Sequence, residues 1–317
     1  MLNIILTNKN MKYFSAKLKT SLAKLLIYLS AQLSLKNGHR LGTLFGWLFA
    51  IIPNRLQQVT TTNIRLCFPE LSAEQHKQLM IKTLAETGKT LIEASPMWRW
   101  NKKKLFSLIK KIHGEELVKK ALKTNGVILA LPHFGNWELL GLYCSANYPT
   151  TSMYQKPKLS QINNTVKHGR ERLGAKLVPA DNQGVRAMLK ALKNNECVCI
   201  LPDQEPSKGN GVFAPFFGIQ AYSMTLISRL AKKTNATVII AYTKRLPEGR
   251  GYEIVFTALP EMKEKINADS LDDSVIYLNK EMEAEIKKVP EQYQWGYKRF
   301  RTQPVSNDNS TVEFYNR

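Results

Sequence analysis

The amino-acid sequence predicts an α/β fold, with a mostly parallel central sheet flanked by helices and, before it, an N-terminal apolar, membrane-associated helical segment. The first observation is that helices alternate with short, near-continuous apolar strands from about residue 56 onward, which is typical of a parallel sheet covered on both faces. The second is that the first 55 residues hold two apolar stretches with basic flanks. We therefore expect an anchor over residues 1–55, an α/β domain over residues 56–304 and a polar tail over residues 305–317.

The two N-terminal apolar stretches cover residues 22–35 and 41–53 and are joined by a short polar segment. Neither reaches the roughly 18 to 20 apolar residues that cross a bilayer. Because cationic flanks prefer the anionic, cytoplasmic leaflet, the pattern favours a helical hairpin or an interfacial anchor there. Two alternatives stay open: the first stretch resembles a signal peptide without a convincing cleavage site, and both stretches could be ordinary core helices.

The elements of the α/β domain follow from hydrophobic period and from helix start signals. A first helix is expected over residues 72–94, where Ser72 precedes Glu74 and Gln75 and apolar residues recur at helical spacing. Further helices are expected over residues 137–145, 184–195, 224–235 and 271–289, and buried strands over residues 126–133, 197–203, 236–246 and 252–259. We find no internal repeat, and the polar tail from Ser306 is expected to fray.

Composition restricts the class of protein and of partner. With 317 residues, 44% of them hydrophobic, the chain can bury a substantial core. It has 46 Lys and Arg against 25 Asp and Glu, a formal charge of +21, so its partners should be anionic: phospholipid head groups, an acidic protein or nucleic acid. Four cysteines, Cys67, Cys144, Cys197 and Cys199, are too few for a disulfide framework and lack a zinc-site spacing. We expect reduced core cysteines, no metal site and no cofactor.

One histidine and one carboxylate stand out in LALPHFGNWELLG, residues 129–141. On a continuous helix His133 and Glu138 would point about 140° apart, but a strand end, a turn at Gly135 and a helix start would bring them together. His133 would then lie at the carboxyl end of a strand, where open α/β sheets bind their ligands. There Glu138 would hydrogen-bond one ring nitrogen while the other accepts a proton, as general-base catalysis needs. The non-catalytic alternative is that His133 caps the helix start and Glu138 favours its dipole.

The sequence shows no nucleophile to accompany this pair, since it lacks a G-x-S-x-G elbow and an activated cysteine. Such a pair suggests that the substrate supplies the reacting hydroxyl group. Further motifs follow in order: YQKP (154–157), GRERLG (169–174), LPDQEPSKGNGVFAPFFG (201–218) and PEQYQWGYKRFRTQP (290–304). Together with the His-x4-Glu spacing and the upstream TTNIRLCFPELS, this ordered set resembles the lipid A biosynthesis acyltransferases of the lysophospholipid acyltransferase superfamily.

The resemblance implies an enzyme that is anchored to the cytoplasmic face of the inner membrane and needs no cofactor. Members of this family transfer a fatty acyl chain from acyl carrier protein to a hydroxyl group of a lipid A precursor, so residues 56–304 would be the catalytic domain, with membrane phospholipid as a further partner. By the same resemblance, His133 is the general base, Glu138 orients it, and Arg170 binds a phosphate or the oxyanion of the tetrahedral intermediate.

Two residues inside the motif and one beyond a later strand are further substrate-binding candidates, and two of the three have a structural alternative. Phe134 and Asn136 lie inside the motif, and Asn136 is also a favoured helix cap. Asp203 follows a strand, as His133 does, so both could line one crevice, although an Asp at a strand exit also caps turns.

The last candidates belong to the motifs that follow. Lys156 lies in YQKP, where the family often has an arginine in place of Gln155. Phe217 and Gly218 end FAPFFG, a segment that could wall an acyl channel or plug the core. The cations gathered in residues 101–120 would steer an acidic carrier protein, or would simply form a solvated helix face.

Two other functions stay open on the sequence alone. The acceptor could be a lysophospholipid or an amino-acid lipid, because the chemistry of the pair is indifferent to what carries the hydroxyl group. From a different class, a non-catalytic RNA- or membrane-binding protein would account for the aromatics and cations interleaved in YQWGYKRFR (293–301). A stacking surface has no use for an apolar anchor or a His-Glu turn, so we expect no nucleic-acid partner.

Overall fold

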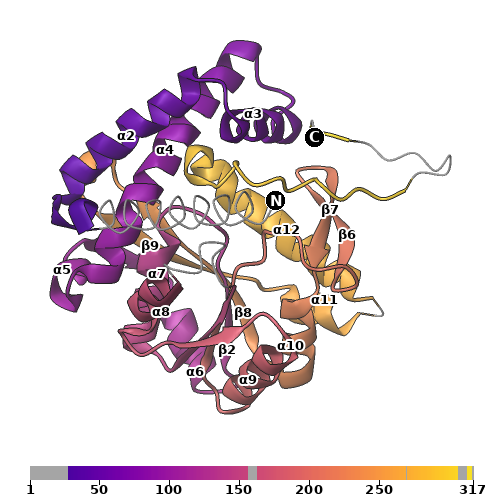
Figure 1. Ribbon diagram of the computed structural model, residues 1–317. Helices are drawn as coiled ribbons and strands as arrows, with labels where there is room; N and C mark the ends of the chain where they lie inside the picture. Colours follow the sequence, from indigo (N-terminus) through magenta and orange to yellow (C-terminus); the bar gives the residue numbers. More distant parts are fainter. Residues whose placement is uncertain (1–27, 156–162, 269, 306–312, 316–317) are drawn as a thin grey trace, which may run out of the picture.

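The computed structural model describes residues 28–155, 163–268, 270–305 and 313–315, and it shows an α/β domain built on one central sheet (Figure 1). The sheet has seven strands among the described residues, in the order β1-β9-β8-β2-β5-β3-β4. Neighbouring strands are parallel except β8 and β9, which run antiparallel. The predicted α/β class, with a mostly parallel sheet flanked by helices, is confirmed.

The strands of this sheet are β1 (Ile109–His113), β2 (Val127–Ala130), β3 (Thr150–Tyr154), β4 (Lys176–Pro179), β5 (Cys197–Ile200), β8 (Thr237–Arg245) and β9 (Tyr252–Ala258), and a separate antiparallel hairpin is formed by β6 (Gly211–Phe216) and β7 (Ile219–Met224). The helices are α2 (Leu35–Ile51), α3 (Arg55–Cys67), α4 (Ala73–Arg99), α5 (Lys102–Phe106), α6 (Glu115–Leu122), α7 (Trp137–Asn147), α8 (Asn163–Glu171), α9 (Asn182–Lys193), α10 (Leu226–Thr234), α11 (Met262–Asn267) and α12 (Leu271–Lys288), with short 3-10 turns η2 (Pro247–Gly249) and η3 (Pro290–Gln292). The four predicted strands correspond to β2, β5, β8 and β9, and the five predicted helices to α4, α7, α9, α10 and α12.

The sheet is buried on both faces because successive residues of its central strands join two separate apolar clusters. Ile128 and Ala130 of β2 pack with side chains of α9, α10 and α12. Val127 and Leu129 point to the opposite face and pack with side chains of α6 and α7. This alternation is what a parallel sheet between two helical layers requires. The four cysteines are free and buried, as expected of core thiols.

Helix α2 lies directly against the long helix α4 at one end of the molecule (Figure 1). Three glycines make this close approach possible. A Cβ atom on Gly46 would lie 2.1 Å from the carbonyl oxygen of Leu84, and one on Gly88 would lie 2.0 Å from the carbonyl oxygen of Gly42. The two backbones therefore touch, and α2 is fixed to the domain that carries the sheet.

Other apolar side chains of α2 face solvent. Leu44, Trp47 and Ile51 are 52%, 50% and 52% exposed, so α2 presents apolar side chains to solvent on the side away from α4. None of the helices that the structure describes combines the length and apolar character needed to cross a bilayer. The predicted stretch 41–53 lies mostly in α2. Of the predicted stretch 22–35, residues 22–27 lie outside the described residues, and the anchor over residues 1–55 stays a prediction.

Part of the C-terminal tail packs on the domain. The ring of Phe314 lies 6.3 Å from that of Phe300, centroid to centroid, and the Tyr315 hydroxyl donates to Oδ1 of Asn63 at 2.5 Å. The expectation that the tail frays from Ser306 onward is therefore wrong for residues 313–315, because their aromatic rings cover apolar surface. The intervening residues of the tail lie outside the described part of the chain.

Candidate active site

The chain forms the predicted strand, turn and helix start around His133. It leaves β2, turns through Gly135 and enters α7 with Glu138 in the first turn. Gly135 has a φ of +58°, and a Cβ atom there would lie 1.6 Å from the carbonyl oxygen of Thr243, so the turn requires glycine. His133 consequently lies past the carboxyl end of β2, beside the end of β5, where open α/β sheets bind ligands.

Asp203, which follows β5, holds the ring of His133. Its Oδ1 lies 2.8 Å from Nδ1 of His133, and its Oδ2 accepts the backbone N–H of His133 at 2.8 Å. Burial opposes ionisation of Asp203, but the attraction of His133 and these hydrogen bonds outweigh burial and hold the pKa of the carboxyl below its usual value. Because Nδ1 donates to a carboxylate, Nε2 is the acceptor, and the amide of Gln204 approaches it at 3.3 Å.

Glu138 pairs with Arg170 of α8, which corrects the predicted hydrogen bond between Glu138 and His133. Oε2 of Glu138 accepts from Nε of Arg170 at 3.0 Å and from Nε1 of Trp98 at 3.0 Å, and Nη2 of Arg170 donates to Oε1. The physical reason is that the guanidinium offers two parallel donors to the carboxylate, while Asp203 already occupies the imidazole nitrogen. Burial would lower the pKa of Arg170, but Glu138 outweighs burial and raises it, so the pair stays charged.

Asn136 is a helix cap and not a substrate donor in this structure. Its Oδ1 accepts the backbone N–H of Leu139 at 2.9 Å, which caps α7. Its Nδ2 donates to Glu93 at 3.0 Å and to the Tyr252 hydroxyl at 3.2 Å. Because the side chain is 3% exposed and its amide is used on both sides, the capping alternative is the correct one.

Four other predicted substrate-binding residues differ from the expectation or lie outside the described residues. Phe134 is 1% exposed and packs edge-on against Tyr242 at 4.6 Å, so it belongs to the core. Phe217 and Gly218 form the two-residue turn of the β6–β7 hairpin, with φ values of +51° and +77°, and the Phe217 ring plugs the core. Lys156 falls in the segment that the structure does not describe.

His133, Glu138 and Arg170 line a single cleft of about 570 Å³. Much of its remaining wall is apolar, including Leu131, Leu142, Met153, Leu177, Ile200 and Met224. Among the described residues, no group of three or more His, Cys, Asp or Glu side chains is arranged to hold a metal ion. A proton acceptor and an arginine beside an apolar cleft suit a substrate that has both a polar reacting group and a hydrocarbon chain.

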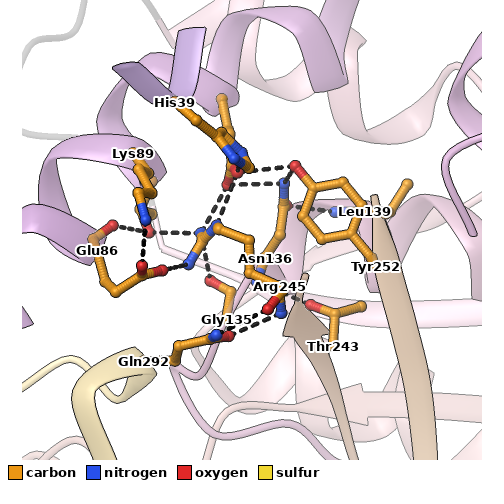
Figure 2. A network of polar contacts seen from close by, with 12 residues as sticks. His39, Glu86, Lys89, Gly135, Asn136, Leu139, Thr243, Arg245, Tyr252 and Gln292 are labelled. Atoms are coloured by element: carbon orange, nitrogen blue, oxygen red, sulfur yellow. Dashed lines mark hydrogen bonds and ion pairs between the residues drawn. The ribbon is translucent and has the colours of Figure 1, made fainter. Parts of the chain in front are cut away.

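A buried network of charged side chains contacts the turn at Gly135 (Figure 2). At its centre is Arg245, at the end of β8, which is 3% exposed. Arg245 forms a two-pronged ion pair with Glu93 of α4, with distances of 2.7 Å and 2.6 Å, and a further ion pair with Glu86 at 2.7 Å. Its Nη2 also donates to the carbonyl oxygen of Gly135 at 3.1 Å, which ties the network to the turn.

Glu93 extends this network to three other elements. It lies 2.5 Å from Nε2 of His39 on α2, and it accepts from the Tyr252 hydroxyl at 2.8 Å and from Asn136 at 3.0 Å. Burial opposes its ionisation, but Arg245 and the hydrogen bond with His39 prevail and lower the pKa of Glu93 to about 2. Glu93 therefore stays an anion at neutral pH and connects α2, α4 and β9 to the turn between β2 and α7.

Comparison with known proteins gives a consistent picture. The chain matches the family model described as bacterial lipid A biosynthesis acyltransferase over residues 10–302. It is 28% identical over 279 residues to the lipid A biosynthesis lauroyltransferase of Escherichia coli strain K12, which covers 88% of this chain and 90% of that protein. It is 30% identical over 275 residues to the palmitoleoyltransferase of the same pathway and organism (85% and 86%) and 24% identical over 248 residues to the myristoyltransferase (76% and 73%).

The fold, the histidine site beside an apolar cleft and these relatives define an O-acyltransferase. The chain belongs to the bacterial lipid A biosynthesis acyltransferase family. The family resemblance in the sequence is thereby confirmed, and the alternative of a non-catalytic binding protein is wrong.

Proposed function

We propose that this enzyme transfers a fatty acyl chain from acyl carrier protein to a hydroxyl group of a lipid A precursor, at the cytoplasmic face of the inner membrane. The observation that carries the proposal is the His133 ring, which is held by Asp203 at 2.8 Å and lines a cleft with an apolar wall. Relatives named for lauroyl, palmitoleoyl and myristoyl transfer in lipid A biosynthesis support a fatty acyl chain as the transferred group and a lipid A precursor as the acceptor class.

His133 is the general base of the proposed reaction. Its Nε2 takes the proton of the acceptor hydroxyl while the hydroxyl oxygen attacks the thioester carbonyl and forms a C–O bond. The resulting tetrahedral intermediate collapses by breaking the C–S bond, and the leaving thiolate takes the proton back from His133. Asp203 keeps Nδ1 protonated and stabilises the charged imidazolium between the two steps.

Arg170 is the cationic group of the proposed site. Glu138 holds its guanidinium through two donors, and 34% of the Arg170 side chain is exposed at the cleft. We assign Arg170 to a phosphate group of the acceptor or to the oxyanion of the tetrahedral intermediate, because a guanidinium binds both with a rigid fork of donors. In this arrangement Glu138 positions Arg170 and does not orient His133.

The exposed side chains of α2 form the proposed membrane contact. Leu44, Trp47 and Ile51 are each about half exposed on a helix that is packed firmly on α4, and the chain is strongly cationic at +21. An apolar helix face on a cationic protein suits an anionic lipid interface. The structure connects this helix to the site through His39 and Glu93.

Replacing Leu44, Trp47 and Ile51 together with serine should weaken binding to vesicles of anionic phospholipid by at least about tenfold. Each large apolar side chain contributes about 1.5 to 3 kcal/mol when it is fully removed from water. Co-sedimentation of the full chain with vesicles measures the effect. The matched control is Ile276→Ser on α12, which is also exposed at 39% and should change nothing. Equal loss in both proteins, or no loss in the triple variant, would move the membrane contact elsewhere.

The proposed function is tested with purified enzyme, two donors and two acceptors, with products read by mass spectrometry. We expect transfer from acyl carrier protein to a lipid A precursor, and little transfer to a lysophospholipid, which is the alternative acceptor. Higher salt should reduce transfer from the carrier protein far more than transfer from acyl-CoA, because the Debye length falls from about 10 Å at 0.1 M to about 3 Å at 1 M.

Two charge-reversal variants distinguish a local docking surface for the carrier protein from an effect of the overall positive charge. Replacing the exposed Lys102 and Lys103 of α5 with glutamate should raise the KM for the carrier protein with little change in kcat. Lys104 is left in place because its ammonium lies 3.6 Å from the ring centre of Trp100. The control reverses Lys232 and Lys233, which are exposed on α10. Equal salt sensitivity of the two donors, or a preference for acyl-CoA, would contradict the assignment of the donor.

A further inference from the structure

Gly141 on α7 differs from every other glycine of the chain. All 17 glycines lie among the described residues, and most are required by a positive φ or by a close backbone neighbour. Gly141 has the ordinary φ of a helix, and a Cβ atom there would meet nothing within 4 Å. Glycine destabilises a helix interior relative to alanine. Neither backbone conformation nor packing therefore accounts for a glycine at this position.

The open space beside Gly141 belongs to the cleft that His133 lines. Glu138, Gly141 and Ser145 are spaced by three and four residues, so they share one face of α7, and all three line the cleft. The Ser145 hydroxyl is turned back onto the carbonyl oxygen of Gly141 at 2.5 Å, so its hydrogen is used within the helix. Beyond Glu138, this face of α7 consequently presents a small and weakly polar surface to the cleft.

We infer that the acyl chain of the donor lies against Gly141, and that the missing side chain sets the longest chain that the enzyme accepts. This inference rests on the proposed function. The thioester carbonyl must reach His133, so the hydrocarbon attached to it extends into the apolar part of the same cleft. Successive turns of α7 lead from Glu138 at the polar wall to Gly141, about 4.5 Å further along the helix axis. A side chain at position 141 would therefore occupy space that a long acyl chain needs.

The test measures chain-length preference in Gly141→Ala and Gly141→Leu, with saturated acyl carrier protein donors from lauroyl to palmitoyl. For Gly141→Leu, the ratio of kcat/KM between the longest and the shortest donor should fall by at least about tenfold, since even one methylene in an apolar pocket changes discrimination by about 10- to 200-fold. Gly141→Ala should shift the ratio in the same direction by less. Asn147→Leu, exposed on the same helix and outside the cleft lining, is the matched control and should leave the ratio unchanged.

A binding measurement makes the test independent of turnover. Displacement of the fluorescent cis-parinaric acid by saturated fatty acids should show weaker binding of the longer acids to Gly141→Leu. An unchanged ratio of kcat/KM between the longest and the shortest donor in both variants would overturn the inference. A KM for the acceptor that is raised equally with every donor would also overturn it, because the acceptor chain would then lie at Gly141. If Gly141→Leu does not fold, the direction in which Gly141→Ala shifts the ratio of kcat/KM between the longest and the shortest donor decides whether the inference holds. Absence of transfer by the unaltered enzyme would refute the proposed function itself.

Discussion

His133→Ala is expected to fold like the unaltered protein and to lose about 10²- to 10⁴-fold in kcat/KM for acyl transfer, the range that general-base catalysis contributes. The loss follows because no other described side chain is placed to take the proton of the acceptor while a carboxylate stabilises the charge. The side chain is only partly buried, at 16% exposed, so its removal leaves a small gap at the cleft wall and not in the core. Steady-state kinetics, with thermal unfolding as the control for folding, measure the effect. A folded His133→Ala enzyme with normal turnover would rule out the mechanism.

The companion variants distinguish the two carboxylates. Asp203→Asn should cost nearly as much in kcat as His133→Ala, because an amide no longer fixes the Nδ1–H tautomer or stabilises the imidazolium. Glu138→Gln should act differently, by loosening Arg170 and raising the KM for the acceptor more than it lowers kcat. The opposite outcome, with Asp203→Asn active and Glu138→Gln inactive in kcat, would restore the sequence-based assignment of Glu138 to the ring.

The fold was predictable where the strands are central and apolar. β2 and β5 are buried along their length, and β8 is buried over residues 238–243, and their apolar runs mark them in the sequence. The strands that were missed are different. β1 and β4 are the two edges of the sheet, and several of their residues face solvent, which breaks the apolar run. β3 is internal but is built from Thr, Ser, Met and Tyr residues, so its sequence has no hydrophobic signature.

The location of the site was predictable from the sequence, but which side chains hydrogen-bond one another was not. The strand, turn and helix around His133 follow from local signals, and the placement of Asp203 at the neighbouring strand end follows from a parallel sheet. Which carboxylate bonds the ring depends on the adjacency of β2 and β5, and that adjacency joins residues 70 positions apart. The same holds for Glu138, whose partner Arg170 lies on another helix. Sequence spacing alone favours the local pair.

The network around Arg245 had no sequence signal of its own. Arg245 ends an apolar strand and Glu93 lies within an apolar stretch of α4, and each by itself is an unremarkable charged residue. They are brought together only by packing of α4 across the end of β8, 152 residues apart in the chain. A charged side chain embedded in an apolar run is the one hint available, because such a residue is rarely buried without a partner.

Arg245→Met is expected to destabilise the protein by about 3 to 5 kcal/mol, because it removes the guanidinium that neutralises Glu93 in a buried site, whereas Glu86 keeps its ion pair with Lys89. Urea denaturation at neutral pH measures the change. The double variant Arg245→Met, Glu93→Leu should recover part of the loss, since it removes the uncompensated charge as well. Lys119→Met, which breaks an exposed pair with Glu115, is the control and should cost about 1 kcal/mol or less. A similar loss of unfolding free energy in Arg245→Met and Lys119→Met would show that the buried Arg245 ion pair contributes no more to stability than an exposed pair.

The pH dependence of Glu93→Gln tests the same network from the other side. The pKa of Glu93 is about 2 in the folded protein against a usual value of 4.5, so ionised Glu93 stabilises the fold above pH 4.5 and this contribution disappears as pH falls toward 2. The difference in free energy of unfolding between the unaltered protein and Glu93→Gln should therefore narrow over that interval.

Activity adds a second readout, because Arg245 and Glu93 hold Gly135 and Asn136 in place. If the network positions His133, Glu93→Gln should lower kcat even at neutral pH and at temperatures where it remains folded. A variant that is less stable but has an unchanged kcat would show that the network has a structural role and does not position His133.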